Sequence, residues 1–218
     1  MQTESIKNIA VFVSGGGTNL GALIDAVKSG KITNGKISLV VSSKSDAYAL
    51  VRANQNGIPA ETVERKKYPG EKEFSAKILE TITPYDIGLI VLAGFSSVLS
   101  EDFVKLYENK IMNTHPTLIP AFCGKGFYGL KVHEKVLERG VKLSGATVHF
   151  ANEITDGGPI ILQKAAEVKE DDTPESLQRR IMAECEHIIL AEAVNLFCND
   201  CLEVRGNKVY IKSGRENS

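Results

Sequence analysis

An amide and an imidazole stand two residues apart near the middle of the chain, at Asn113 and His115. Pro116 disfavours helical backbone in the residue before it, so the segment Asn-Thr-His-Pro is expected to be extended at the end of a strand. Because side chains alternate along an extended chain, Asn113 and His115 then point to the same side. A neutral donor beside a group that can carry a proton near neutral pH suits a carbonyl oxygen that becomes negatively charged. Taken alone, the segment also fits a strand end with an ordinary hydrogen-bonded histidine.

A glycine-rich turn near the N-terminus has the pattern of a phosphate-binding loop. Residues 8–13 are an apolar run typical of a buried parallel strand, and they lead directly into Ser-Gly-Gly-Gly-Thr-Asn at residues 14–19. A helical pattern follows over residues 20–27. Free backbone N–H groups at a helix start bind anions, and glycine lets the backbone approach a phosphate closely. A tight turn without a ligand is the alternative.

The residues that the turn lacks narrow the choice of phosphate ligand. A dinucleotide fingerprint beginning at Gly15 would need glycine where the chain has Leu20, and no acidic residue ends the next predicted strand, residues 37–41. No Gly-Lys-Ser/Thr sequence follows, which argues against a P-loop. A phosphate monoester on a small metabolite therefore fits better than NAD or ATP.

Two further groups have side chains that could take part in chemistry. Asp156 precedes two glycines in an acidic loop over residues 151–159, where an aspartate either bonds its own backbone in a turn or holds a carboxylate in a cleft. The loop alone favours the turn. His133 stands among charged neighbours on a predicted helix over residues 130–138, so we expect it on a solvated helix face.

The composition restricts the class of protein. The chain has 218 residues, 43% of them hydrophobic and 24% charged, with a net charge of −1, which argues against nucleic acid as an obligate partner. No apolar run approaches the roughly 20 residues that span a bilayer, and the first residues lack a signal pattern, so we expect a cytoplasmic protein without membrane contact. Four cysteines are too sparse for a disulfide framework, and Cys198 and Cys201 lack further ligands for a metal.

The elements that must position these residues alternate between strand and helix. Helical patterns cover residues 46–55 and the apolar positions Phe74, Ile78, Leu79 and Ile82, while residues 59–63 and 87–93 read as strands. This alternation predicts an α/β fold with a doubly wound, mostly parallel central sheet, and such sheets bind ligands at the carboxyl ends of their strands.

The second half of the chain follows a different pattern. Its glycine-rich segment, residues 123–129, is long enough to act as a lid. We expect strands at residues 144–150 and 160–162, a long helix from residue 173 to about 197, and a C-terminal hairpin over residues 202–211. We expect one domain over residues 1–218, with a phosphate-binding half at approximately 1–108 and a catalytic half at 109–218.

Five motifs, in this order and at this spacing, cover nearly the whole chain. They are SGGGTNL at residues 14–20, LAGF at 92–95, NTHPTLIP at 113–120, GATVHF at 145–150 and DGGPIILQ at 156–163. Each is weak singly, but the ordered set resembles the folate-dependent formyltransferases of the phosphoribosylglycinamide type, from purine biosynthesis.

The resemblance implies transfer of the formyl group of 10-formyltetrahydrofolate, a co-substrate, to the amine of glycinamide ribonucleotide, without a metal. The products would be formylglycinamide ribonucleotide and tetrahydrofolate. By similarity the catalytic residues would be Asn113, His115 and Asp156, with Asn113 donating to the formyl oxygen and Asp156 favouring the imidazolium form of His115. A water held by Asp156 could carry the proton from the attacking amine to the leaving nitrogen. Thr147 and His149 would support the site structurally.

The resemblance also implies the binding residues. Gly17, Thr18 and Asn19 would hold the phosphoribosyl end, and Glu186 would contact the ribose or glycinamide side. The catalytic half would bind most of the folate. The folate-binding residues would be Ser96, Ser97, Val98, Leu99, Asn113, Asn152, Glu153, Ile154, Thr155 and Asp156.

The chain departs from the family pattern at two places. Glu71, with Lys72 beside it, stands where the family often has an arginine near the folate glutamate or phosphate end, so that contact is unassigned. The lid around Cys123 to Gly126 differs from the commoner proline-containing form, so its contacts are unassigned as well.

Several other functions fit part of the pattern. Methionyl-tRNA formyltransferase would carry a further C-terminal domain with a basic surface, and formyltetrahydrofolate hydrolase an N-terminal regulatory domain; we expect neither here. A sugar-nucleotide formyltransferase would not need the glycine-rich turn in this form. A non-catalytic phosphometabolite-binding protein would bind its ligand regardless of changes at His115 or Asp156. We expect a monomer or a weak homodimer.

Overall fold

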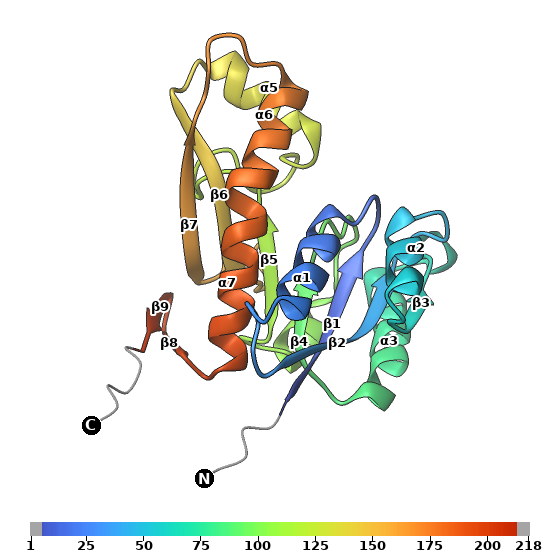
Figure 1. Ribbon diagram of the computed structural model, residues 1–218. Helices are drawn as coiled ribbons and strands as arrows, with labels where there is room; N and C mark the ends of the chain where they lie inside the picture. Colours follow the sequence, from blue (N-terminus) through green and yellow to red (C-terminus); the bar gives the residue numbers. More distant parts are fainter. Residues whose placement is uncertain (1–5, 213–218) are drawn as a thin grey trace, which may run out of the picture.

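The computed structural model describes residues 6–212, which form an α/β architecture around one nine-stranded sheet (Figure 1). The strand order is β3-β2-β1-β4-β5-β6-β7-β9-β8. The strands are β1 Lys7–Val13, β2 Gly35–Ser42, β3 Ala60–Thr62, β4 Ile87–Leu92, β5 Ile111–His115, β6 Leu143–Phe150, β7 Ile160–Glu167, β8 Leu202–Arg205 and β9 Lys208–Ile211. The α-helices are α1 Thr18–Lys28, α2 Tyr48–Gln55, α3 Glu71–Ile82, α4 Glu101–Leu106, α5 Leu130–Arg139, α6 Pro174–Ile181 and α7 His187–Cys198.

The sheet is parallel in its first part and antiparallel in its second. Strands β3, β2, β1, β4 and β5 are parallel, as strand–helix alternation predicts. β6 and β7 continue the sheet as antiparallel strands, and β8 and β9 form an antiparallel hairpin joined to β7. The predicted mostly parallel sheet and C-terminal hairpin are therefore confirmed. Local patterns did not predict the antiparallel pairing of β5 with β6.

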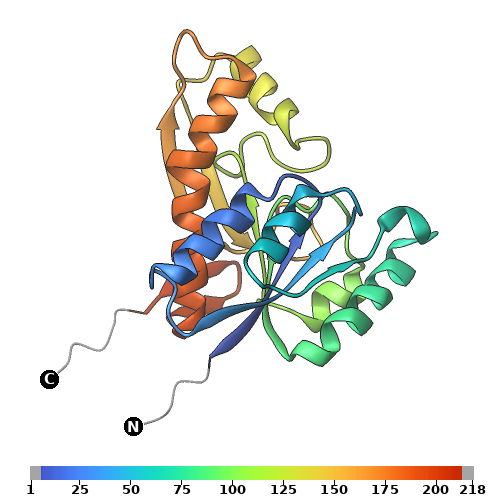
Figure 2. The same ribbon diagram turned by 45° about the vertical axis from the view of Figure 1, so that its right-hand side comes forward.

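Helices cover both faces of the sheet, which is why β1 is apolar from Ile9 to Val13. Val11 packs on one side with α1 and α7, whereas its neighbour Phe12 packs on the other side with α3 and α4. Because successive strand residues point to opposite faces, a strand buried on both faces needs a continuous apolar run. Helices α1 and α7 lie side by side in both views (Figures 1 and 2).

The long helix predicted from residue 173 is interrupted. Its start is as expected, since Thr173 and Ser176 form a reciprocal capping box around Pro174. A π-helical turn, Met182–Glu186, then separates α6 from α7. Such turns are often found at functional sites, and this one carries the buried side chain of Glu186.

Strand β7 is longer than its apolar run. The sequence predicts residues 160–162 only, but the ladder with β6 continues to Glu167. The added residues are mostly exposed, and backbone hydrogen bonds to β6 hold them in the sheet. An apolar pattern cannot reveal a strand end that is held by its backbone.

The prediction that His133 lies on a solvated face is wrong. Its side chain is 1% exposed, because it shares the inner arc of α5 with Val132 and Val136. The charged neighbours Lys131 and Glu134 face outward instead. Burial, with a smaller contribution from nearby His115, lowers the pKa of His133 to about 4.

Replacing His133 with leucine is expected to reduce the acid sensitivity of the fold. Because its pKa is about 4 in the folded protein and 6.5 in the unfolded chain, protonation favours unfolding as the pH falls below 6.5. At pH 5 this costs the wild type about 2 kcal/mol that the leucine variant does not lose. Urea unfolding of both proteins at pH 7.5 and pH 5 measures the difference. Equal losses of unfolding free energy in the two proteins would contradict this expectation, because they would mean that folding does not change the pKa of His133.

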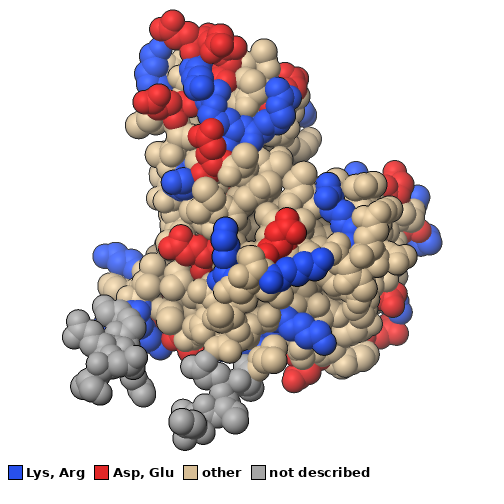
Figure 3. All heavy atoms as spheres, in the orientation of Figure 1, with Lys and Arg blue, Asp and Glu red and all other residues tan. Residues whose placement is uncertain are grey.

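The surface charges, the helix lengths and the grouping of possible metal ligands can each be compared with what a nucleic acid, a membrane or a metal would require. On the face shown in Figure 3, basic and acidic side chains are interspersed. Among residues 6–212, no helix has the length and apolar character needed to cross a membrane. Within the same residues, no three or more His, Cys, Asp or Glu side chains gather as a metal site would require, and all four cysteines are free thiols.

Candidate active site

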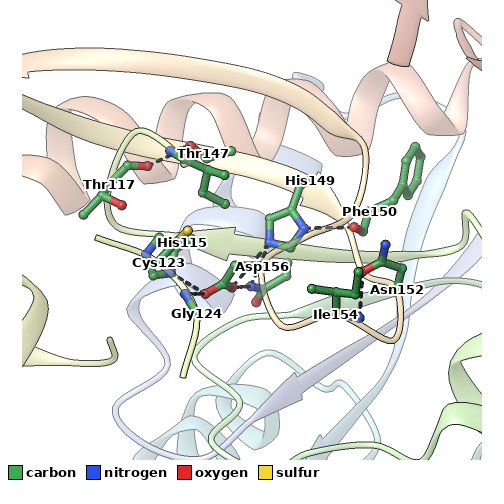
Figure 4. A network of polar contacts seen from close by, with 12 residues as sticks. His115, Thr117, Cys123, Gly124, Thr147, His149, Phe150, Asn152, Ile154 and Asp156 are labelled. Carbon is green, nitrogen blue, oxygen red and sulfur yellow. Dashed lines mark hydrogen bonds and ion pairs between the residues drawn. The ribbon is translucent and has the colours of Figure 1, made fainter. Parts of the chain in front are cut away.

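The structure brings Asn113, His115 and Asp156 together at the carboxyl end of β5. Asn113 Nδ2 lies 3.4 Å from Asp156 Oδ1, and His115 Nδ1 lies 3.5 Å from Asp156 Oδ2. Figure 4 shows the Asp156 carboxylate between the rings of His115 and His149. Asn113 and His115 therefore face the same carboxylate, as their spacing on an extended strand predicts.

Asp156 lies in a turn, but its carboxylate does not bond that turn. The residue has φ 56°, and Gly157 N–H closes the turn by donating to Ile154 O at 2.9 Å. Gly158 then passes so close to β6 that a Cβ there would lie 1.9 Å from Phe150 O. The turn thus directs Asp156 inward, and its side chain is only 8% exposed. The preference for a simple turn former, based on the loop alone, is wrong.

The hydrogen bonds of Asp156 keep it ionised. Burial on its own would raise the pKa of this carboxyl group. The bond to His149, the Gly124 N–H at 2.8 Å and the nearby His115 ring outweigh burial and lower the pKa below its usual value. A carboxylate held in this way is an anion at neutral pH.

Both ring nitrogens of His115 face oxygen acceptors. Nε2 lies 2.8 Å from the carbonyl oxygen of Phe122, and Nδ1 faces Asp156. The ring can donate to both oxygens only as an imidazolium, since a neutral imidazole has one N–H. The side chain is 5% exposed, so protein groups rather than water surround it.

His149, which the resemblance gives a supporting role, contacts two of the catalytic candidates, Asn113 and Asp156. Its Nδ1 lies 2.8 Å from Phe150 O, and its Nε2 lies 3.2 Å from Asn113 Nδ2 and 3.7 Å from Asp156 Oδ1. Nε2 of His149 therefore lies beside both the Asn113 amide and the Asp156 carboxylate, and the tautomer of the ring decides which of the two it bonds. The pairing of Asn113 with His149 across β5 and β6 creates this contact, and local patterns do not reveal it.

Thr147, two residues earlier on β6, supports the chain after β5. Its hydroxyl donates to Thr117 O at 2.7 Å and accepts from Ile119 N–H at 3.0 Å. Gln163 of β7 also donates to it, at 3.0 Å. Thr147 contacts none of the three catalytic candidates in these bonds, which agrees with a supporting role.

Phe122, which precedes the predicted lid, and Gly124 within it contact the catalytic candidates through their backbone. Phe122 O bonds His115, and Gly124 N–H donates to Asp156 (Figure 4). Cys123 lies between them, and burial followed by the charge of Asp156 raises the pKa of its thiol. Gly124, in the segment whose contacts the resemblance leaves unassigned, thus bonds Asp156, and the neighbouring Phe122 bonds His115.

The glycine-rich turn opens α1 beside a buried acid. Gly17 is the N-cap with φ 69°, and a Cβ there would lie 2.7 Å from the Ala49 Cβ, so this position requires glycine. Asn19 Nδ2 donates to Glu186 Oε2 at 2.9 Å, although the two residues are 167 positions apart. Burial raises the pKa of Glu186, and the Asn19 bond offsets part of that effect. Asn19 Oδ1 is buried without a hydrogen-bond partner in the described structure, so it is free to accept from a ligand.

The two segments assigned to folate differ in how they expose their side chains. Val98 and Ile154 are 59% and 64% exposed, which leaves apolar surface for an aromatic ligand on each segment. Leu99 instead packs in the core with α3 and α4, so only its backbone can contact a ligand. Ser96 N–H donates to Ser14 Oγ at 2.8 Å, which joins this segment to the glycine-rich turn.

The remaining folate candidates lie on the surface or line the turn before Asp156. Asn152 Oδ1 accepts from Ile154 N–H at 3.0 Å and so shapes that turn. Ser97 is half-buried, while Glu153 and Thr155 are exposed. Near Glu71, the Lys72 ammonium pairs with Asp102 at 3.7 Å on the surface, so the structure does not assign a replacement for the family arginine.

Known proteins resemble this chain over most of its length. A family model described as formyl transferase matches residues 7–194. The chain is 36% identical over 212 residues to the chloroplastic phosphoribosylglycinamide formyltransferase of Arabidopsis thaliana, covering 97% of this chain and 72% of that protein. It is 35% identical over 208 residues to phosphoribosylglycinamide formyltransferase of Escherichia coli, covering 95% of each. The crystal structure of glycinamide ribonucleotide transformylase 1 from Symbiobacterium toebii superposes with a TM-score of 0.90 at 40% identity, covering 97% of this chain and 96% of that one.

Proposed function

The chain belongs to the formyl transferase family, and we propose that it is a phosphoribosylglycinamide formyltransferase of de novo purine biosynthesis. It transfers the formyl group of 10-formyltetrahydrofolate to the amine of glycinamide ribonucleotide and releases formylglycinamide ribonucleotide and tetrahydrofolate. The observation that carries this proposal is the cluster of Asn113, His115 and Asp156.

Asn113 supplies the donor for the formyl oxygen. One amide hydrogen is directed to His149 at 3.2 Å and the other to Asp156 at 3.4 Å. The contact with Asp156 is long and therefore the weaker of the two. A formyl oxygen that gains negative charge is a stronger acceptor at closer range, so the second N–H turns to it during the attack of the amine.

His115 stabilises the same oxygen and moves a proton. The formyl oxygen takes the place of the Phe122 carbonyl at Nε2, which requires the lid to shift when the substrates bind. Asp156 keeps the ring oriented and charged from the Nδ1 side. The imidazolium can then give a proton to the folate nitrogen as the carbon–nitrogen bond breaks, and a water on Asp156 carries the proton lost by the attacking amine back to the ring.

The two substrates approach this cluster from neighbouring segments. Gly17, Thr18 and Asn19 hold the phosphoribosyl end, and Glu186 receives the ribose or glycinamide side. The folate lies along residues 96–99 and 152–156, which fits the exposed apolar side chains of Val98 and Ile154. The phosphate-binding half is then approximately residues 1–108 and the catalytic half residues 109–218, within one domain.

Glu186→Gln is expected to make the fold more stable and substrate binding weaker. The pKa of Glu186 is raised in the folded protein. At a pH above the pKa of a glutamate in the unfolded chain, this group therefore lowers the free energy of unfolding. Glutamine can still accept from Asn19 but carries no buried charge, so Tm should rise by roughly 2–4 °C for each kcal/mol gained. KM for glycinamide ribonucleotide should rise about tenfold, since a charged acceptor is lost. Calorimetry and steady-state kinetics measure the two effects, and a variant with lower Tm and unchanged KM would assign Glu186 to the fold alone.

Related activities are distinguished by the acceptor. The experiment is a spectroscopic assay with 10-formyl-5,8-dideazafolate and glycinamide ribonucleotide, in parallel with a sugar-nucleotide amine and without any amine. Formyl transfer to glycinamide ribonucleotide is expected. Transfer to the sugar nucleotide alone, or formate release without an amine, would replace the proposal with a sugar-nucleotide formyltransferase or a hydrolase. Phosphate-ligand binding without turnover would indicate a non-catalytic binding protein.

We also propose that the protein acts in the cytoplasm as a monomer or weak homodimer. Sedimentation velocity over a range of concentrations tests the assembly state. A tight complex that persists on dilution would contradict it.

A further inference from the structure

A row of three side chains crosses strands β5, β6 and β7 on the face of the sheet that carries the active site. His115 of β5 is paired with Thr147 of β6, and Thr147 is paired with Gln163 of β7. Directly opposed residues of antiparallel strands point to the same face, so the three side chains lie side by side. Gln163, the last residue of the motif DGGPIILQ, is the exposed end of this row.

The amide nitrogen of Gln163 holds two groups near the start of the chain that follows β5. Nε2 donates to Ile119 O at 2.9 Å and to the Thr147 hydroxyl oxygen at 3.0 Å. Because a carbonyl oxygen only accepts, the side chain presents its nitrogen and not Oε1 to Ile119. Gln163 and Ile119 are 44 positions apart, so this bond ties β7 to the segment that leaves the end of β5.

The same amide fixes the direction of the Thr147 hydroxyl. A hydroxyl group has one hydrogen to donate and two lone pairs. Ile119 N–H, at 3.0 Å, and Gln163 occupy the two lone pairs, so the hydrogen is directed to Thr117 O at 2.7 Å (Figure 4). Thr147 is 0% exposed, so water cannot take the place of a lost partner. Removing the Gln163 amide therefore frees the hydroxyl as well as Ile119 O.

The segment held in this way leads to the carbonyl group that His115 faces. The Thr117 hydroxyl donates to Ala121 O at 2.7 Å, and Ala121 N–H donates to Leu118 O at 2.9 Å, so this part of the chain forms a closed turn. Phe122 follows the turn directly, and its carbonyl oxygen lies 2.8 Å from His115 Nε2. The position of this carbonyl relative to the ring therefore depends on how firmly the turn is held.

We propose that Gln163 is a positioning residue for His115, an inference that rests on the proposed function. Its two hydrogen bonds hold the turn after β5, and the turn holds the Phe122 carbonyl against the ring. The ring is then kept with Nε2 pointed at the place that the formyl oxygen takes during transfer. Gln163 acts through Thr147 and this turn, and it moves no proton itself.

The kinetic test compares Gln163→Met, which keeps the length of the side chain without its N–H groups, with Gln55→Met at an exposed position at the end of α2. Gln163→Met is expected to lower kcat about tenfold, the effect of one or two neutral hydrogen bonds. KM for both substrates should stay within about twofold, because Gln163 lies outside the segments assigned to them. Gln55→Met should match the wild type.

Combination with His115→Ala separates positioning of the ring from a general loss of structure. If Gln163 acts through the ring, Gln163→Met should lower kcat less than about twofold once His115 is already alanine. A loss of about tenfold in both backgrounds, or an unchanged kcat in Gln163→Met alone, would overturn the proposal.

The Nε2–H proton of His115 gives a measurement that does not need turnover. Its hydrogen bond to Phe122 O slows exchange with water, so nuclear magnetic resonance should detect it in the wild type and in Gln55→Met. Exchange should be faster in Gln163→Met. If the variant changes this signal while the wild type does not formylate glycinamide ribonucleotide, the proposed function fails and the role of Gln163 stands. Equal exchange rates in Gln163→Met and the wild type would contradict that role.

Gln163→Glu keeps the shape of the side chain but presents an acceptor to Ile119 O. The Thr147 hydroxyl can then turn from Thr117 O to the new carboxylate. The glutamate variant should therefore lose at least as much kcat as the methionine variant. If the methionine variant does not fold, full kcat in the folded glutamate variant would overturn the proposal as well.

Discussion

His115→Ala and Asp156→Asn are each expected to lower kcat about 10²–10⁴-fold, the usual range for a positioned acid–base group. Asp156 Oδ2 lies 3.5 Å from His115 Nδ1, and in the proposed mechanism this carboxylate orients the ring and favours its imidazolium form. Asparagine retains the shape of this side chain, including an oxygen that can accept from Gly124 N–H, but it lacks the charge. The loss should appear in kcat at saturating concentrations of both substrates, with smaller changes in KM.

The double variant should lose little more than the more damaged single variant. When two groups act as one unit, removing either disables the other, so the effects do not add. Asp171→Asn makes the same chemical change at an exposed position and should keep full activity. Single-turnover rates for the wild type, the two single variants and the double variant measure the coupling. Additive losses would mean that His115 and Asp156 contribute by separate routes.

The parallel part of the sheet could be predicted because its determinants are local. Strand β1 is buried on both faces from Ile9 to Val13 and is apolar at each of these positions, so Val11 and Phe12 pack in the two opposite cores. The positions of Asn113 and His115 at the end of β5 follow from the proline after them. The roles predicted for Glu186 and Asp156 rest only on the resemblance to a family, because the sequence around each of these two residues does not by itself indicate a functional site.

The rest of the site depends on contacts between distant segments. His149 reaches Asn113 only because β6 pairs antiparallel with β5, and hydrophobic patterns do not specify which strands pair. His133 illustrates a different difficulty, because charged neighbours on a helix face outward while residues three and four positions apart share the inner arc. The π-turn at Met182–Glu186 has no sequence signal in an otherwise regular helical pattern.

Asp156 connects these separate parts of the chain. It receives Asn113 and His115 from β5, His149 from β6 and Gly124 N–H from the lid. The Gly124 N–H is one of the groups that lower the pKa of Asp156, so the backbone of the segment predicted as a lid helps to keep this carboxylate ionised.

Asn113→Ala is expected to lower kcat about 10²–10³-fold, the cost typical of removing one oxyanion donor. Its two N–H groups face His149 Nε2 and Asp156 Oδ1 at 3.2 Å and 3.4 Å, and the one on Asp156 is free to turn to the formyl oxygen. The donor matters most when the oxygen is charged, so the affinity for 10-formyl-5,8-dideazafolate should change by less than about threefold. Asn54→Ala, on the exposed side of α2, is the matched control and should behave as the wild type.

Asn113→Asp separates the donor from the shape of the side chain. Aspartate fits the same space, but it replaces both N–H groups by acceptors and places a second carboxylate within about 3.4 Å of Asp156. The aspartate variant should therefore lose at least as much kcat as the alanine variant, and its activity should rise as the pH falls and the new acid is protonated. Titration calorimetry with the folate analogue and pH–rate profiles from pH 5 to 9 measure both effects. If the alanine variant instead keeps its kcat and loses folate affinity, Asn113 serves to bind the folate and another group stabilises the oxyanion.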